Sequence, residues 1–346
     1  MGNVMERNQI SRKGLTFGII LLFIGTSIIP STAQNIWKPS LLTSRGNWLY
    51  VGGSGPGNYS RIQDAIDNAI DGDTVFVYSG TYYENLVVTK SISVIGEDKN
   101  ITVIDGMGAK DKNCVTITDT SKVNLMGFTF QNATYPNTYG VEIEDANEIT
   151  IIDNIFNYDY FGLWIFGDNN IISNNKFSNI TYSCVIIIKA NYNLFSYNNI
   201  IKSNGGGIEV WTHSEYNIIS HNHISTPYTC IIFYGHDCNS NRINNNTMSD
   251  SLAGIGLLEN SERNMISYNN FIKIKKVVRF YGCNINTFDS NYWGRPLTHP
   301  KIIFGIRLIY LFTIKSHSYY FPDHNIYLPI LKTYIDKNPA KEPYDI

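Results

Sequence analysis

The chain has 346 residues, a net charge of −2 and a charged fraction of only 16%. Because nucleic-acid-binding domains carry clustered positive charge, this balance argues against nucleic acid as a partner. The length is ample for one long domain with a large buried core. The five cysteines are an odd number, so they cannot all pair with one another.

The N-terminus has the layout of an export signal. Basic residues precede an apolar run, which small residues follow, at Arg7, Arg12, Lys13, Leu15–Ile29 and Ser31–Ala33. We predict a secretory signal peptide at residues 1–33, a linker at 34–49, and a secreted, extracellular or cell-surface location. The alternative is an uncleaved anchor, the one membrane contact that we expect. The apolar run is short for a span, which needs about 20 residues.

A short amphipathic helix is expected after the linker. Apolar residues recur there on one helical face, at Ile62, Ala65, Ile66, Ala69 and Ile70. The Ser60 hydroxyl can cap the first turn. We therefore predict a helix at residues 61–70.

A short phrase recurs seven times through the middle of the chain. It consists of an aliphatic or aromatic residue, two variable residues, an asparagine, one more residue and a large apolar residue. The asparagines are Asn154, Asn175, Asn198, Asn222, Asn246, Asn269 and Asn291, which lie 21, 23, 24, 24, 23 and 22 residues apart. Such a period indicates a stacked repeat architecture.

A second marker runs in step with the first. Short segments open with a small residue and place apolar residues second and fourth, at Gly140–Ile143, Gly162–Ile165, Cys184–Ile187, Gly207–Val210, Cys230–Phe233 and Gly254–Leu257. This alternation is typical of a strand with one face buried. Each repeat therefore holds at least two short strands, joined by turns rich in asparagine, serine and glycine.

The repeat length selects the architecture. A β-propeller blade needs about 40 residues, whereas one turn of a coiled parallel sheet fits 22 to 24 residues. Strands of successive turns lie about 4.8 Å apart, so equivalent asparagines stack, and each amide can bond to the next. We predict this ladder, which satisfies buried amides. The alternative, that asparagine only favours turns, does not explain the fixed register.

These repeats resemble those of right-handed parallel β-helix proteins of the pectin-lyase-like class, especially the NosD-like and carbohydrate-binding/sugar-hydrolase repeat families. The similarity covers residues 50–296, including Gly80–Asn85 and Gly127–Phe130, which resemble first coils of the class. The resemblance implies an all-β solenoid of roughly nine coils, with the helix at 61–70 as an N-terminal cap.

Two outward stripes form the candidate ligand site. The first stripe includes Glu142, Trp164 and Glu209, and the second includes Trp211 and Tyr234. Aromatic rings stack on sugar faces while carboxylates accept hydrogen bonds from hydroxyls, so we predict a carbohydrate or cell-surface polymer as partner.

The tail offers a competing interpretation of these stripes. Residues 297–346 contain an apolar run that fits no repeat, and Asn338–Ile346 is expected to form a terminal strap. We expect the tail to pack back on the β-helix. If it covers Trp164, Phe166, Trp211 and Tyr234, it removes an exposed apolar patch and leaves no groove.

No complete catalytic motif is present, so the catalytic residues stay unknown and the chain is predicted to be more a binding or structural protein than an enzyme. Gly80–Glu84 resembles pectin methylesterases and Gly235–Asp237 resembles polygalacturonases, but their partner motifs are missing. The alternative is a polysaccharide-active lyase, hydrolase or epimerase. Its carboxylate pair could be Glu142 with Glu144, or Glu209 with Asp237.

No cofactor is predicted, but copper and calcium are alternatives. The NosD-like resemblance implies a periplasmic protein that matures a copper site, and His213 and His236 occupy nearly equivalent turn positions on adjacent coils. Calcium would follow from a pectate-lyase-like acidic cluster. The competing interpretation is solvated turn histidines.

The cysteines are predicted to be mostly free and buried. Cys184 and Cys230 share one register two coils apart, as do Cys238 and Cys283. Two coils span about 9.6 Å, whereas disulfide-bonded Cα atoms lie within about 7 Å.

Overall fold

The computed structural model describes residues 46–283, 285–297, 299–314 and 324–346. The signal peptide predicted at 1–33 and most of the 34–49 linker lie outside these residues. Among the described residues, no helix has the length and apolar character of a membrane span.

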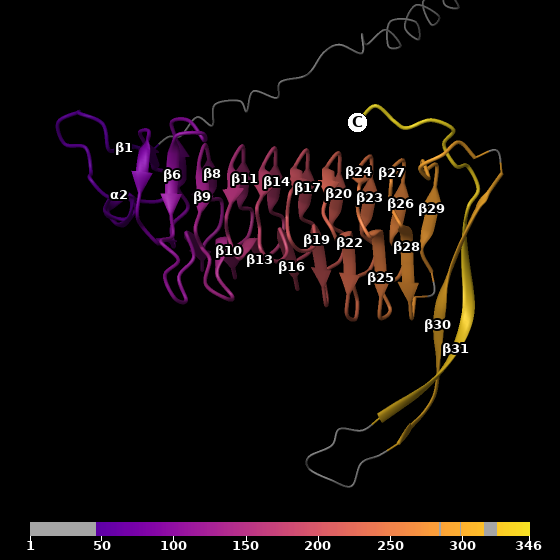
Figure 1. The fold of residues 1–346 in the computed structure, drawn as a ribbon. Helices are drawn as coiled ribbons and strands as arrows, with labels where there is room; N and C mark the ends of the chain where they lie inside the picture. The colour runs from indigo at the N-terminus through magenta and orange to yellow at the C-terminus, as the bar shows by residue number, and fades with distance from the viewer. Residues whose placement is uncertain (1–45, 284, 298, 315–323) are drawn as a thin grey trace, which may run out of the picture. The chain divides into compact units, whose positions relative to one another are not determined.

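Three sheets run side by side along one solenoid, and the coils contribute parallel strands to each of them (Figure 1). The first has 11 strands: β1 (Trp48–Val51), β2 (Thr74–Val77), β5 (Ser93–Gly96), β8 (Asn124–Met126), β11 (Thr150–Ile152), β14 (Ile171–Ser173), β17 (Leu194–Ser196), β20 (Ile218–Ser220), β23 (Arg242–Asn244), β26 (Met265–Ser267) and β29 (Thr287–Asp289). We call it sheet A.

Sheet B has nine strands: β3 (Gly80–Tyr82), β6 (Thr102–Asp105), β9 (Thr129–Gln131), β12 (Ile155–Asn157), β15 (Lys176–Ser178), β18 (Asn199–Ile201), β21 (His223–Ser225), β24 (Thr247–Ser249) and β27 (Asn270–Ile272). Sheet C has 11 strands: β4 (Leu86–Val88), β7 (Val115–Thr118), β10 (Tyr139–Glu144), β13 (Phe161–Phe166), β16 (Val185–Ile188), β19 (Ile208–Trp211), β22 (Thr229–Tyr234), β25 (Ala253–Leu258), β28 (Lys276–Tyr281), β30 (Lys301–Ile314) and β31 (His324–Asp336).

The predicted all-β parallel solenoid is confirmed, with about ten turns where roughly nine were expected. Its core is made of columns of identical or similar side chains. Phe130, Phe156 and Phe177 stack from coil to coil, with ring centroids 5.1 and 4.5 Å apart. They are fully buried, because one position per strand always points inward.

The helix α2 (Ile62–Asn68) is shorter than predicted. Arg61, not Ser60, is the N-cap residue, and the Glu84 carboxylate accepts hydrogen bonds from the Ile62 and Gln63 amides at 2.8 and 3.1 Å. Ile70 is exposed and does not extend the buried face. The helix packs against β1, β2 and β4, and its role as an end cap stays a prediction.

The tail forms a long antiparallel hairpin of β30 and β31. Its base is attached to the last coils, since Ile306 pairs with Tyr281 of β28 and the Tyr334 ring packs 4.6 Å from Phe280. After the hairpin, the Tyr344 amide donates to the Asn270 side chain at 2.8 Å. The final residues thus form a strap over the last coils.

Candidate functional site

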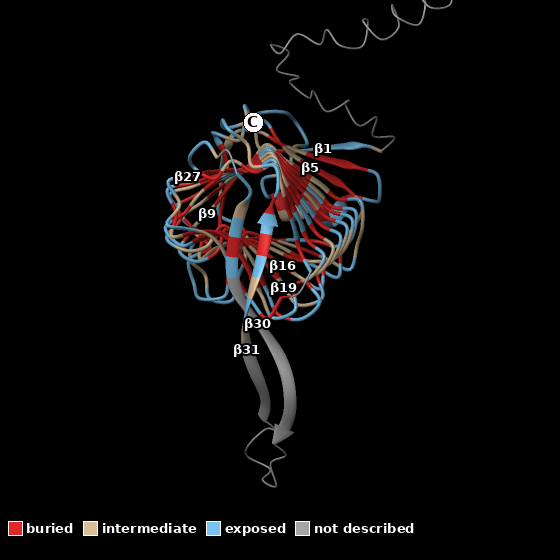
Figure 2. Cartoon of the chain, turned by 90° about the vertical axis from the view of Figure 1, so that its right-hand side faces the viewer, coloured by how far each residue is buried: buried red, intermediate tan, exposed pale blue. Residues whose placement is uncertain are grey.

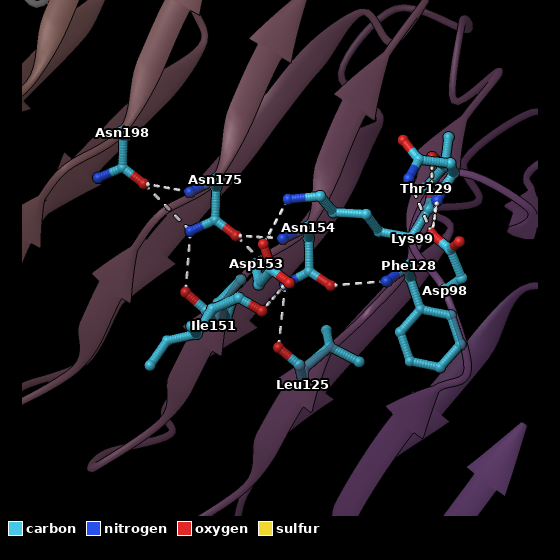
Figure 3. Close-up of polar contacts among 12 residues, drawn as sticks. Asp98, Lys99, Leu125, Phe128, Thr129, Ile151, Asp153, Asn154, Asn175 and Asn198 are labelled. Atoms are coloured by element: carbon cyan, nitrogen blue, oxygen red, sulfur yellow. Dashed lines mark hydrogen bonds and ion pairs between the residues drawn. The ribbon is translucent and has the colours of Figure 1, made fainter. Parts of the chain in front are cut away.

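The seven asparagines of the predicted ladder form one continuous hydrogen-bonded column. Each amide nitrogen donates to the side-chain oxygen of the next coil, at distances from 2.9 to 3.2 Å. Figure 3 shows Asn154, Asn175 and Asn198, with the Asn154 amide also bonded to the Leu125 carbonyl. All seven are buried, so the column holds adjacent coils in register without leaving unpaired amides.

A second asparagine column was missed by the sequence analysis. Its members are buried and bonded from coil to coil, at Asn170, Asn193, Asn217, Asn241, Asn264 and Asn286. Each lies five residues before a ladder asparagine. That constant spacing was a usable signal.

The predicted stripe lies on the outer face of sheet C. Strand pairing brings Glu142 beside Trp164, and Glu209 beside Ile186 and Ile232. Trp211 of the second stripe pairs with Tyr234. Glu142, Trp164, Glu209 and Trp211 are half-buried, and Tyr234 is 48% exposed.

The described tail residues do not cover this stripe. The hydrogen bonds that the structure gives for the tail join it to the last coils, at Asn270, Asp289, Ser290, Asn291 and Trp293. The expectation that the tail covers Trp164, Phe166, Trp211 and Tyr234 is therefore corrected for the described residues. The physical reason is the buried Asp336 carboxylate, whose donors lie in the last coils.

The Glu209 carboxylate is fixed in place by two neighbours. The Ser183 hydroxyl donates a short hydrogen bond to one oxygen, and the Trp211 indole nitrogen donates to the other at 2.9 Å. Gly206 lies beside it, where an added Cβ would come within 2.9 Å of the same carboxylate oxygen. The side chain is therefore positioned at little entropic cost when a ligand arrives.

Glu209 lies at the wall of a hollow of about 400 Å³. Tyr182, Ser183, Asn204, Tyr228 and Thr229 also line it. Both tyrosines are exposed, and the remaining lining groups supply hydroxyl and amide hydrogen-bonding atoms. Polar groups that converge in a hollow with aromatic walls suit a polyhydroxylated ligand.

A cation reaches the same hollow from a distant coil. The Arg279 guanidinium donates to the Thr229 hydroxyl at 3.1 Å. Gly256 lies between Ile232 and Arg279 in the stripe and places no side chain there. Arg279 lies three coils from Glu209 in the register of sheet C, and its side chain extends back toward the hollow.

Glu142 has a different environment. The Asn113 amide donates to its carboxylate at 2.7 Å, but burial, reinforced by Glu144, raises the pKa of Glu142 above its usual range. Tyr139 packs 5.3 Å from the Trp164 ring, and burial together with Glu142 raises its pKa to about 12. This end of the stripe thus holds a carboxyl that gives up its proton at a higher pH than an ordinary glutamate.

The carboxylates do not all come together. Glu142 and Glu209 are three coils apart in the stripe, or about 14 Å, which is beyond the separation of glycosidase carboxylate pairs. Glu144 lies two residues from Glu142 on the same strand, about 7 Å along it. Asp237 instead pairs with His213, at 3.2 Å.

The candidate metal ligands are on adjacent coils. The His213 amide donates to the His236 carbonyl at 2.8 Å, and both side chains are exposed. Within the described ranges, no group of three histidine, cysteine or acidic residues is arranged to hold a metal ion. The structure thus brings His213 and His236 close in the backbone without giving them a third ligand.

All five cysteines are free and buried, which confirms the prediction. Burial raises the pKa of each thiol, to about 12 for Cys184, Cys230, Cys238 and Cys283. The reactive form of a cysteine is the thiolate. Because the raised pKa disfavours that form, these cysteines serve as core residues.

Comparisons with known proteins agree with this fold. The family model described as a right handed beta helix region matches residues 113–272. A probable pectinesterase/pectinesterase inhibitor of Arabidopsis thaliana is 30% identical over 130 residues, which are 35% of this chain and 23% of that protein. The match therefore spans less than a quarter of that relative.

Solved structures are similar in fold. A complex of XylC with xylose superposes with a TM-score of 0.58 and 10% identity, covering 72% of this chain and 69% of the other. The A-module of a mannuronan C-5 epimerase of Azotobacter vinelandii superposes with a TM-score of 0.51 and 15% identity, covering 66% of this chain and 83% of the other. An alginate lyase of Paenibacillus superposes with a TM-score of 0.50 and 13% identity, covering 70% of this chain and 95% of the other. The chain thus has the fold of a right-handed parallel β-helix.

Proposed function

We propose that this chain binds carbohydrate along the outer face of sheet C, over Trp164, Glu209, Trp211 and the hollow between them and Thr229. One observation carries this proposal: the Glu209 carboxylate is held by Ser183 and Trp211 at the wall of a polar hollow of about 400 Å³. A preorganised acceptor beside aromatic rings is what recognition of sugar hydroxyls requires.

The solenoid geometry supports a polymer more than a small sugar. Side chains at one position of sheet C recur about every 4.8 Å along the axis, close to the repeat of one sugar unit in an extended glycan. Successive sugars would meet Trp164, Ile186, Glu209 and Ile232 in turn, because these residues are neighbours in the stripe. Export by the predicted signal peptide would bring the chain to extracellular polysaccharides.

The similar proteins supply further support. Their names refer to a pectinesterase, an alginate lyase, a mannuronan epimerase and a complex with xylose. Each concerns a carbohydrate, although the structural matches are too distant in sequence to carry residues across. The ligand class therefore rests on the site in this chain.

A polysaccharide-active enzyme is the second candidate, and Glu142 favours it. Its pKa is raised mainly by burial, as suits a general acid, and Glu144 lies two residues away on the same strand. Glutamine at 142 would keep the contact with Asn113 and remove the acid. Release of sugar ends from polysaccharides by the wild type but not by Glu142→Gln would establish catalysis.

A glycan array tests the binding function. Wild type is expected to bind a polysaccharide, with at least tenfold weaker binding for Trp211→Ala and Trp164→Ala. Tyr216→Ala is the control, since this exposed tyrosine lies in a turn before sheet A and stacks on Tyr192. Wild-type binding that survives both tryptophan substitutions would remove the proposed face. The copper alternative is tested by metal titration of the wild type against His213→Ala/His236→Ala.

A further inference from the structure

The hollow beside Glu209 lies where three successive turns lead into β16, β19 and β22. It is lined by residues 181–183, 204–206 and 228–229, together with Glu209 and Ile232. Figure 2 labels β16 and β19 and shows the buried strands in red, with exposed and half-buried turns around them. Among the lining residues that the structure describes, only Glu209 is charged. The lining of the hollow therefore carries a single negative charge.

The Glu209 carboxylate has no cationic partner among the described residues, whose ion pairs all lie elsewhere. Its two oxygens accept hydrogen bonds from the Ser183 hydroxyl and the Trp211 indole, which are both neutral donors. A sugar hydroxyl would add another neutral donor and leave the charge of this half-buried group uncompensated. A protonated amine would instead form a charge-assisted hydrogen bond, whereas an acidic sugar at the same point would be repelled.

Two exposed tyrosine rings make the hollow more suitable for a cation. Tyr182 and Tyr228 line it and are 53% and 55% exposed. The Tyr182 ring is held against Tyr160 and Phe161, with ring centroids 4.7 and 5.7 Å apart. The face of an aromatic ring attracts a positive charge. The rings and the carboxylate therefore favour the same kind of ligand group.

A charge of the opposite sign lies at the rim of the hollow. The Arg279 guanidinium donates to the Thr229 hydroxyl at 3.1 Å and forms no ion pair with any described residue. Thr229 is adjacent to Gly206, because the Gly207 amide donates to the Thr229 carbonyl at 3.1 Å. An added Cβ on Gly206 would come 2.9 Å from a Glu209 oxygen. About two coil spacings, roughly 10 Å, therefore separate the carboxylate from the guanidinium.

These two charges call for a ligand that carries the reverse pattern. The guanidinium has further N–H donors, and their fork matches the two oxygens of a carboxylate. We propose that the glycan bound at this hollow carries a protonated amino sugar, which meets Glu209, and a nearby acidic sugar, whose carboxylate meets Arg279. This inference rests on the proposed carbohydrate binding at the same face and names the class of polysaccharide.

Three oligosaccharides of equal length test the charge pattern by calorimetric titration of the full chain. De-N-acetylated hyaluronan alternates amino sugars with acidic sugars. Hyaluronan has the same backbone, but acetyl groups remove the charge of the amine, and chitosan has amines without acidic groups. The wild type is expected to bind the de-N-acetylated hyaluronan about tenfold more tightly than either of the others. Equal affinity in either comparison would overturn the proposal.

Two variants connect each charge to its ligand group. Glu209→Gln is expected to lose the preference for de-N-acetylated hyaluronan over hyaluronan, and Arg279→Gln the preference for it over chitosan. Glu144→Gln and Arg242→Gln are the controls, since both parent side chains are exposed and lie outside the hollow. A preference that survives its substitution would contradict the assignment.

The outcomes separate this inference from the proposed function. Binding that depends on Trp211 but is equal for the three oligosaccharides would refute the charge pattern alone. Absence of binding to any polysaccharide would refute the proposed function as well.

Discussion

The Asp336 carboxylate takes the position of the next asparagine beyond Asn291 in the ladder. Asn291 donates from its backbone amide at 3.0 Å and from its side chain at 3.2 Å to one Asp336 oxygen. Asn269 makes the same two bonds to the Asn291 side chain, at 3.0 and 3.1 Å. At the other end the Phe128 amide donates to the Asn154 side chain. The hairpin thus completes the amide column at its C-terminal end.

Asp336→Ala is expected to loosen the last coil. The substitution removes the acceptor for Asn291 and for the Trp293 indole, which donates at 3.0 Å. Unpaired buried donors cost about 1–3 kcal/mol each. Hydrogen exchange should therefore speed up at residues 287–293 while protection at β16 and β19 is retained. Asp345→Ala, which changes an exposed carboxylate, is the control, and equal exchange in the two variants would contradict the role of Asp336.

Asn222→Leu is expected to destabilise the middle of the solenoid. The Asn198 backbone and side-chain amides both donate to the Asn222 oxygen, at 2.9 and 3.0 Å. Losing this buried acceptor should lower the free energy of unfolding by about 3 kcal/mol, measured by urea denaturation. Asn199→Ala, in an exposed position of β18 on the neighbouring coil, should change it by less than about 0.5 kcal/mol. Similar losses in both would argue against the ladder as a stabilising device.

Asp159 predicts a pH dependence of stability. Its side chain is fully buried, and its Oδ2 has no hydrogen-bond partner among the described residues. Burial raises the pKa of Asp159 well above its usual range, and Asp105 adds to the shift. The folded chain therefore holds a proton that the unfolded chain releases near the ordinary value of about 3.9, so stability falls as the pH rises above that value.

Asp159→Asn should remove this part of the pH dependence. Urea midpoints from pH 4 to pH 7 should fall less steeply for the variant than for the wild type. The variant should also be the more stable of the two at pH 7. Parallel profiles would show that Asp159 is solvated or paired in the folded chain.

The thiols should be inert until the chain unfolds. Burial raises the pKa of four of them to about 12 and the pKa of Cys114 well above its usual range. At pH 8 a thiol reagent should label none of the five in the folded chain and all five in denaturant. Rapid labelling of the native chain would contradict the buried register of these cysteines.

The repeat could be read from the sequence because each coil is local. One short phrase, repeated every 21 to 24 residues, places an inward asparagine between two inward apolar residues. The coil length and the ladder register therefore followed from the spacing alone. The second asparagine column, from Asn170 onward, is equally periodic. The same search for a repeated asparagine, made five residues earlier in each repeat, would have found it.

Side-chain contacts between different coils could not be predicted from the spacing of residues in the sequence. Ser183 and Glu209 are 26 residues apart and meet because their side chains lean across neighbouring strands. Arg279 extends toward Thr229, where the stripe carries only Gly256 between Ile232 and Arg279. The tail was recognised as foreign to the repeat, but its position depends on the contact of Asp336 with Asn291, 45 residues away.

Hydrogen exchange of the chain with and without a bound polysaccharide tests the proposed glycan face most directly. Binding along sheet C should protect residues 181–186, 204–211 and 228–234, which carry Glu209, Trp211 and the walls of the hollow. Binding should leave the hydrogen-exchange rates of the sheet A strands unchanged. Protection confined to sheet A or to the hairpin, with none at these three segments, would contradict the account.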